Sequence, residues 1–207
     1  MGTIRSRRVI RAALAIGIAS SLWLVLGVAQ AQRAGSGPGS PALRIVSPPA
    51  GSTAILIQPD EPGQRLLIVG RIENTAGRPI AGASVTAYNT DAQGLYNPVS
   101  AGTREPRIRG TVLTDADGRF QMLTVRPAPY PSGDEPAHVH FMINAPSYVM
   151  TFSDIWFEGD PLITRERLDD AQRDMDAHRE LNLQVRPVET GPGGLQTVRH
   201  TVVLQGD

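Results

Sequence analysis

Hydrophobic and polar residues alternate in short runs from Gln64 onward, and turn-forming residues interrupt these runs about every ten positions. Side chains of a strand point alternately to its two faces, so this pattern is typical of strands with one buried face. The pattern predicts strands at Arg65–Ile72, Ala83–Tyr88, Thr111–Leu113, Phe120–Val125, His138–Ile143, Val149–Phe157 and Thr197–Leu204. Many short strands separated by turns favour an all-β, two-sheet β-sandwich.

One segment carries a helical pattern instead. Thr164–Ala177 interleaves acidic and basic residues, and its first residue is a suitable N-cap. Its apolar stripe is narrow, so we expect one short helix on the surface of the sandwich. Asp115–Gly118 is interpreted as a tight hairpin turn, because the twelfth position of a calcium loop starting there is Arg126 rather than Glu. Gly191–Gly194 is interpreted as a loop.

The chain begins with the features of an export signal. Four arginines and no acidic residue precede the apolar run Ala12–Val28, and Ala29-Gln30-Ala31 has the small-x-small form of a cleavage site. We therefore interpret residues 1–31 as a signal peptide and expect an exported protein, periplasmic or extracellular. The alternative is an uncleaved N-terminal anchor, which would hold the protein at a membrane. An apolar run of about 17 residues is at the short limit for crossing a bilayer.

Composition divides the rest of the chain and limits its chemistry. Residues 32–63 are rich in Pro, Gly and Ser and predict an arm, whereas residues 64–207 are expected to form the folded domain. All 20 basic residues are Arg, and removing residues 1–31 leaves 16 of them against 20 acidic residues, a net charge of −4. Nucleic-acid binding is therefore not expected. Cys and Lys are absent, which excludes thiolate metal sites and Schiff-base chemistry.

Two histidines on one predicted strand form the sharpest local signal. His138 and His140 flank Val139 in an apolar run, so both imidazoles project from the same face. Two buried imidazoles at this spacing are costly to protonate together, and a shared metal ion removes that cost. The alternative is a pair of surface histidines on an edge strand.

Several metal sites are compatible with this pair. A cupin site needs a Glu shortly after it, where Asn144 and Ala145 stand, and a copper–zinc site needs more histidines than His178 and His200 supply. A ferrous site with two His and one carboxylate stays open. The candidate carboxylates are Asp134, Glu135 and Glu158.

Two tyrosines favour ferric iron. Tyr96 follows a predicted strand, and Tyr130 lies between two prolines that restrict its backbone, eight residues before His138. A free phenol ionises at about pH 10, so phenolate ligation requires a strongly polarising cation. Two phenolates and one hydroxide balance the charge of a ferric ion, and two neutral imidazoles complete five ligands.

The motifs from about Gly70 to Pro161 resemble the intradiol ring-cleavage dioxygenases. The resemblance is carried by Gly70-Arg71-Ile72, Gly77–Ala83, Gly94-Leu95-Tyr96, Thr114–Phe120, Thr124–Pro131, Pro136–Phe141 and Trp156–Pro161. It implies a prealbumin-like sandwich that binds one Fe(3+), with Tyr96 and His138 as equatorial ligands and Tyr130 and His140 as axial ligands. The implied partners are a small aromatic diol and O2, and a homo-oligomer is compatible with it.

The resemblance also implies the reaction. A catechol-type diol would bind iron through both oxygens and displace hydroxide and Tyr130, which take up the substrate protons. Dioxygen then adds to the activated ring, and cleavage between the two hydroxyl-bearing carbons gives a muconate-type diacid that contains both oxygen atoms.

The sequence departs from the family pattern near the expected site. Glu135 stands where the family usually has Arg, Asp154 stands where Gln is common, and Ser132 replaces an aromatic residue in a shortened loop. We expect the metal ligands to be retained and activity to be weakened, with Glu135 acting on the anionic substrate by charge. The alternative function is an exported transthyretin-like or carboxypeptidase-regulatory-like module that binds a partner without catalysis.

Overall fold

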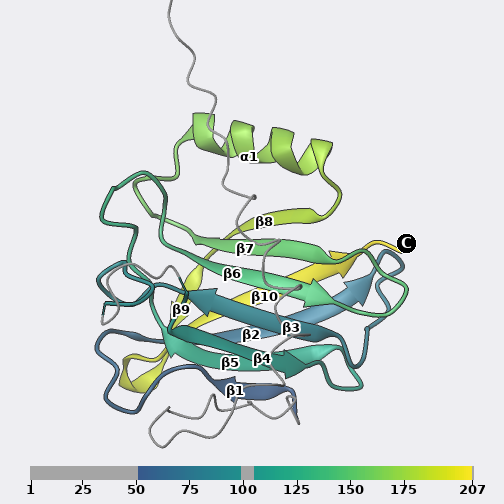
Figure 1. Ribbon diagram of the computed structural model, residues 1–207, viewed down its shortest axis with the longest axis horizontal. Helices are drawn as coiled ribbons and strands as arrows, with labels where there is room; N and C mark the ends of the chain where they lie inside the picture. The colour runs from purple at the N-terminus through teal and green to yellow at the C-terminus, as the bar shows by residue number, and fades with distance from the viewer. Residues whose placement is uncertain (1–50, 99–104, 207) are drawn as a thin grey trace, which may run out of the picture. The chain divides into compact units, whose positions relative to one another are not determined.

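The computed structural model describes residues 51–98 and 105–206, which are drawn in colour in Figure 1. Within these residues ten strands form two five-stranded sheets. The first sheet has the order β1 (Thr53–Ile55), β5 (Arg119–Val125), β2 (Arg65–Asn74), β10 (Gln196–Leu204), β9 (Val188–Thr190). The second has the order β4 (Ile108–Leu113), β3 (Ser84–Asn89), β6 (His138–Asn144), β7 (Thr151–Phe157), β8 (Leu181–Arg186).

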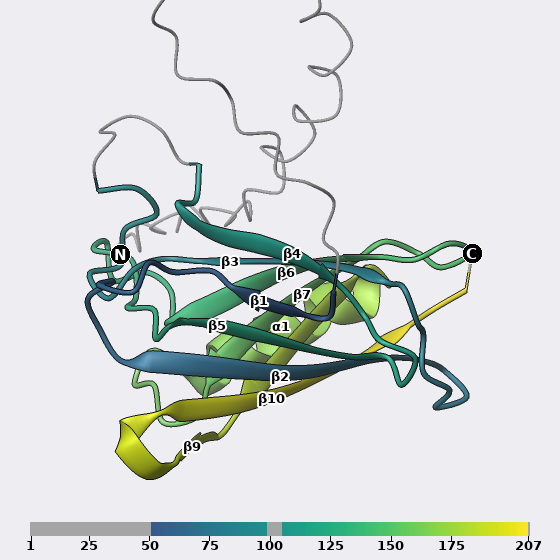
Figure 2. The same cartoon turned by 90° about the horizontal axis from the view of Figure 1, so that it is seen from below.

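The two sheets pack face to face around one apolar core. Figure 2 shows β2 and β10 in one layer and β3, β4 and β6 in the other. In β2 every second residue is buried from Leu66 to Ile72, so the alternation in the sequence marks the inner face of the sheet. Side chains from both sheets are fully buried between them, among them Ile68, Phe120, Phe141 and Ile155. The predicted two-sheet β-sandwich is confirmed.

Three strands were not predicted. Strand β1 lies within the predicted arm, where it pairs in parallel with β5, and Ile57 just after it is buried. The sheet therefore begins before residue 64, which corrects the expected boundary of the domain. Strands β1 and β9 have only three residues each, and all residues of β8 are half-buried, so none of the three has a period-two burial pattern long enough to detect.

The single α-helix of the described residues is α1 (Arg165–Ala177). Thr164 caps it by accepting a hydrogen bond from the Arg167 backbone N–H, and the helix has no buried residue. Figure 1 shows α1 beyond β8, at the edge of the second sheet, so the predicted surface helix is confirmed. Among the described residues, no helix combines the length and the apolar character needed to cross a membrane.

The predicted turn and loop also form. Asp115 accepts hydrogen bonds from the backbone of Asp117 and Arg119, and Gly118 closes the turn between β4 and β5. Residues 191–194 contain a short 3-10 turn, Pro192–Gly194, between β9 and β10. Residues 1–50, which include the predicted signal peptide and most of the arm, lie outside the described residues.

Candidate metal centre

The four predicted ligands come together at one end of the second sheet. The hydroxyl oxygens of Tyr96 and Tyr130 are 2.6 Å apart, and Tyr130 Oη is 3.1 Å from His138 Nε2. His138 Nε2 is in turn 2.8 Å from His140 Nε2. The four atoms therefore form a row, Tyr96–Tyr130–His138–His140, in which each atom lies within hydrogen-bond distance of the next. Such an arrangement is expected if the four side chains share a ligand. Their role as metal ligands stays a prediction.

Strand geometry positions the histidines. His138 and His140 lie on the outer face of β6, while Val139 is fully buried in the core. The side chain of His138 is nearly buried, and that of His140 is partly open to solvent. The structure thus confirms that both imidazoles project from the same face.

Two loops supply the tyrosines, and hydrogen bonds join them. The first tyrosine loop, residues 90–98, follows β3, and the second tyrosine loop, residues 126–137, connects β5 to β6. Thr90 Oγ1 donates to the Ala128 carbonyl over 2.9 Å, and the Ala128 N–H donates to the Asp91 carbonyl over 3.1 Å. Both loops are therefore held to each other independently of the tyrosine side chains.

The hydrogen bonds of the two histidines fix their tautomers. His138 Nδ1 is 2.6 Å from the Pro136 carbonyl oxygen, which can only accept, so this Nδ1 carries a hydrogen. His140 Nδ1 donates to the Asp154 carboxylate over 2.7 Å. Each Nε2 is then left as the atom that can bind a cation. Lone pairs of two neutral imidazoles would repel at 2.8 Å, so the pair is suited to share one cation.

The two imidazoles differ in proton affinity. Burial, and then the positive charge of a protonated His140, lower the pKa of His138 to about 4. Burial also disfavours protonation of His140, but the charge and the hydrogen bond of Asp154 outweigh it and raise the pKa of His140. At neutral pH His138 is therefore a neutral imidazole, the form that binds metals.

The tyrosines are held as phenols by their surroundings. Burial is the largest cause that raises the pKa of Tyr96, followed by its hydrogen bond to Tyr130. Burial also raises the pKa of Tyr130, to about 12. A phenolate in this site therefore requires a strongly polarising cation, so the donor set fits a hard, highly charged metal ion.

Carboxylate-based sites are not formed in the part of the chain that the structure describes. There, no three side chains of His, Asp or Glu come close enough to hold a metal ion. The open alternative of two histidines and one carboxylate from Asp134, Glu135 or Glu158 is therefore not supported. Two tyrosines and two histidines are the set that the fold brings together.

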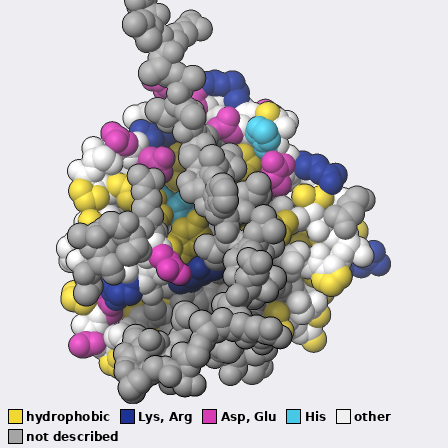
Figure 3. Space-filling view, viewed as in Figure 1, with side chains coloured by type: hydrophobic (Ala, Val, Ile, Leu, Met, Phe, Trp, Pro, Cys, Tyr) yellow, Lys and Arg dark blue, Asp and Glu magenta, His cyan; other side chains and the backbone are white. Residues whose placement is uncertain are grey.

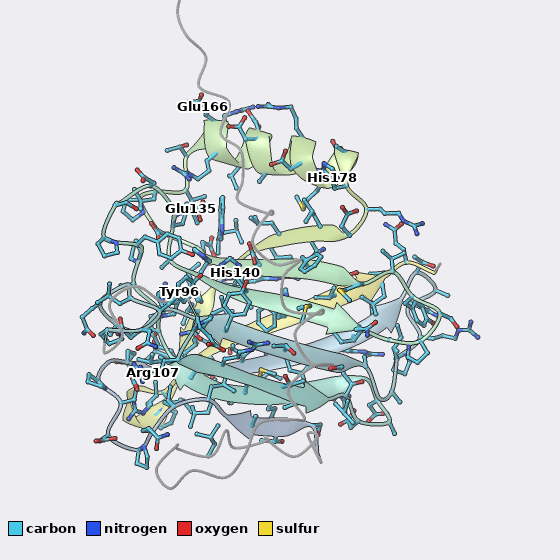
Figure 4. All side chains as sticks on the ribbon, viewed as in Figure 1. Tyr96, Arg107, Glu135, His140, Glu166 and His178 are labelled. Carbon is cyan, nitrogen blue, oxygen red and sulfur yellow. The ribbon has the colours of Figure 1, made fainter. Side chains whose placement is uncertain are left out.

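Glu135 lies beside the cluster, as its sequence position predicts. Figure 4 labels it near His140, on the side of α1, and its charge acts on Tyr130 and His140. Burial raises the pKa of Glu135, while His140 acts in the opposite direction. Figure 3 shows acidic side chains near histidine atoms on this face of the molecule.

Arg107 and Arg126 contact other groups than Glu135. Arg107 forms a bidentate ion pair with Glu61, with nitrogen–oxygen distances of 2.5 and 2.7 Å. The guanidinium of Arg126 lies 3.6 Å above the centre of the Phe157 ring. Within the described residues, Glu135 has no ion pair with any Arg closer than 4.0 Å.

One aromatic side chain next to the cluster is not among the residues predicted from the sequence. Tyr88 on β3 pairs directly with His140 on β6, and the ring centres are 4.7 Å apart. It is also 6.1 Å from the Tyr96 ring. The cross-strand register that creates this contact joins segments 52 residues apart (88 to 140), so the strand pattern alone does not reveal it.

A separate open pocket of about 400 Å³ lies between the second tyrosine loop and residues 158–162. Its lining includes Arg126, Pro129, Ala137 and Asp160 but none of the four clustered side chains. Because the hydroxyl and imidazole groups of the cluster do not line this pocket, we do not assign the pocket to the candidate metal centre.

Comparison with known proteins identifies the family of this chain. A protein-family model described as Dioxygenase matches residues 40–206. Chlorocatechol 1,2-dioxygenase of Rhodococcus opacus is 29% identical over 164 residues, which is 70% of this chain and 62% of that protein. Catechol 1,2-dioxygenase 1 of Acinetobacter lwoffii is 33% identical over 57% of this chain and 46% of its own length. The chain thus spans less than two thirds of these relatives.

Solved structures share the fold. Catechol 1,2-dioxygenase of Acinetobacter radioresistens aligns with a TM-score of 0.60 and 21% identity, covering 77% of this chain and 58% of that one. The dioxygenase domain of a carbohydrate-binding fusion protein from Streptomyces sp. SirexAA-E aligns with a TM-score of 0.55 and 22% identity, covering 79% and 97%. Since the family model covers most of the sequence and the fold agrees with it, the chain belongs to the intradiol ring-cleavage dioxygenase family.

Proposed function

We propose that this protein is an iron(III) dioxygenase that uses O2 to cleave a catechol-type ring between its two hydroxyl-bearing carbons. The convergence of Tyr96, Tyr130, His138 and His140 in a chain without Cys supports the proposal most strongly. Ferric iron, when bound by these four side chains, would supply the Lewis acidity that ionises the phenols and activates the diol and O2.

Tyr130 is suited to move a proton. Its hydroxyl lies between Tyr96 and His138, and burial raises its pKa to about 12. A Tyr130 phenolate released from the cluster therefore has a high affinity for a proton and can accept one from a substrate hydroxyl. No separate general base is needed for this transfer.

His138 and His140 have a different task. Both keep their Nδ1 hydrogen in a hydrogen bond to the protein, and their Nε2 atoms then lie 2.8 Å apart, with that of His138 3.1 Å from Tyr130 Oη. They are therefore positioned to stay in place while Tyr130 moves. The buried side of His138 also keeps water from that side of the site.

The charge around the cluster bears on the choice of substrate. Glu135 and Asp154 are carboxylates near the site, and neither has an arginine ion pair within the described residues. Anionic diols are repelled by such a site, so we propose weak activity toward carboxylate-bearing rings and a preference for rings with a neutral or cationic substituent.

Iron loading tests the proposal directly. The protein is purified from iron-supplemented cells, and iron content, visible absorption and O2 uptake with catechol are measured. We expect one iron per chain, a broad visible band that catechol shifts to longer wavelength, and a muconate-type product. The His138→Ala variant should lose all three. A folded, colourless wild type with zinc or no metal would contradict the proposal and favour a non-catalytic binding module.

A further inference from the structure

The register between two strands places Asp154 beside the cluster. Strands β6 and β7 are antiparallel, and Asp154 is the direct partner of His140 in that pairing. Its Oδ1 accepts the His140 Nδ1 hydrogen over 2.7 Å. The neighbours Ser153 and Ile155 are buried, which fixes the backbone at this point of β7. The contact is therefore set by the fold rather than by a flexible surface loop.

The two histidines of the cluster consequently have different partners. His138 donates to a neutral backbone carbonyl, whereas His140 donates to a carboxylate. A charged acceptor on the remote nitrogen makes an imidazole a more strongly donating ligand through its other nitrogen. The amide that is usual for the family at position 154 would accept the same hydrogen bond without the charge.

The charge of Asp154 is directed at the cluster. Within the described residues its only ion-pair partner is His140, and no Arg lies within 4.0 Å of it. Its field acts on the surrounding rings of Tyr88, Tyr96 and Tyr130. A carboxylate whose only role was to link β6 to β7 by a hydrogen bond would not need to lie near the tyrosine rings.

We infer that Asp154 is a positioning residue that locks the His140 tautomer and makes the bound ferric ion more electron-rich. The inference rests on the proposed function, because it concerns the ion that the cluster would hold. Three consequences can be measured without turnover. The carboxylate should strengthen iron retention, and it should keep the reduction potential of the iron low and the phenolate-to-iron band at short wavelength.

The test compares Asp154→Asn, Asp154→Ala and Asp154→Glu with the wild type. The Asn side chain has nearly the same shape but no charge, Ala removes the acceptor, and Glu keeps the charge. The matched control is Asp117→Asn, which removes one carboxylate from an exposed turn. Folding is checked by circular dichroism, and each protein is loaded with iron(III) nitrilotriacetate and then titrated with ethylenediaminetetraacetate.

We expect Asp154→Ala to release iron at a chelator concentration 10 to 100 times lower, about the usual effect of losing such a partner. Asp154→Asn should keep more of the iron but show a band at longer wavelength and a higher reduction potential. Asp154→Glu should bring the band and the reduction potential back toward the wild-type values. Asp117→Asn should change neither iron retention, nor the band, nor the potential. Wild-type retention, band and potential in Asp154→Asn and Asp154→Ala would overturn this inference alone. A wild type that binds no iron would overturn it together with the proposed function.

Discussion

The hydroxyl oxygens of Tyr96 and Tyr130 lie 2.6 Å apart, although 34 residues separate the two tyrosines in the chain. Each comes from its own loop, and Gly94 of the first loop lies against the Pro129 carbonyl of the second. A Cβ on Gly94 would lie 2.0 Å from that oxygen. A glycine two residues before the first tyrosine thus allows the second to approach it.

Gly94→Ala should therefore separate the tyrosines. The substitution adds a methyl group against backbone that cannot move without shifting the second tyrosine loop, and the φ of +82° at this position is itself unfavourable for Ala. We expect a loss of stability above about 1 kcal/mol and loss of stoichiometric iron. Denaturant unfolding and iron analysis measure the two effects.

Gly82→Ala is the matched control. Its φ is +72°, but a Cβ there would meet no atom within 4 Å. It therefore has the backbone strain without the clash. Equal losses of stability and iron in both variants would show that strain alone, and not the approach of the two loops, explains the effect of Gly94→Ala.

Tyr130→Phe should separate iron binding from proton uptake. The variant keeps the ring and three of the four proposed ligands, so we expect iron to bind more weakly and the visible band to change. Turnover should fall by at least about 100-fold, since a positioned proton acceptor typically contributes a factor of that size. Tyr148→Phe, outside the cluster, is the control. Wild-type colour and turnover in Tyr130→Phe would remove Tyr130 from the proposed site.

Much of the site was predictable because its determinants are local. The alternation of β6 places His138 and His140 on one face, and two prolines restrict the backbone on either side of Tyr130. Such features depend on residues that are close in the sequence. The family motifs supplied the rest of the ligand set, and the comparisons support the family.

What the sequence could not show depends on long-range pairing. The row from Tyr88 through His140 to Asp154 exists only because β3, β6 and β7 pair in one register. The same limit applies to charge: Arg107 forms its ion pair with the buried Glu61, 46 residues away in the chain. Strand patterns predict the face on which a residue lies, but not its neighbour on the next strand.

A buried histidine away from the cluster should make the protein sensitive to acid. His200 is 1% exposed, and burial is the main cause that lowers its pKa from 6.5 to about 3. Between these values the unfolded chain binds a proton that the folded chain does not, so the free energy of unfolding falls as pH decreases. The slope from this one group is at most about 1.4 kcal/mol per pH unit.

His200→Gln tests this origin of the acid sensitivity. Gln can still donate to Ser153, which His200 contacts over 3.0 Å, but it does not titrate. Stability measured by urea unfolding between pH 3 and 6.5 should fall less steeply with acid than in the wild type, even if the variant is less stable throughout. His178→Gln, which removes an exposed imidazole, should keep the wild-type slope. An unchanged slope in His200→Gln would show that the folded state protonates His200 readily.

Export remains a prediction from the first 31 residues, which lie outside the described part of the chain. We expect the mature protein to start near Gln32 and to be found outside the cytoplasm, because four arginines, an apolar run and Ala29-Gln30-Ala31 follow one another. Cell fractionation and intact-mass analysis measure both properties. A mature protein that retains Met1 would instead indicate an N-terminal anchor.

Glu135 should set the response of the enzyme to substrate charge. Two unit charges about 6 Å apart interact by roughly 3 kcal/mol at an effective dielectric of about 20. Glu135 is partly exposed, so solvent reduces this value, which corresponds to at most about two orders of magnitude in rate. We expect kcat/KM for protocatechuate to rise from wild type to Glu135→Gln and again to Glu135→Arg, with a smaller rise for catechol.

The neighbouring exposed carboxylate provides the control, because Asp134→Asn changes the net charge by the same amount as Glu135→Gln. If Glu135 acts on the site through its field at His140 and Tyr130, only the change at position 135 should alter the ratio of kcat/KM between protocatechuate and catechol. Equal effects of the two neutralising variants would assign the selectivity to overall charge. Repulsion between Glu135 and the carboxylate of protocatechuate must slow the binding of this substrate. A wild type that already cleaves protocatechuate as fast as Glu135→Arg would therefore show that Glu135 does not repel the substrate.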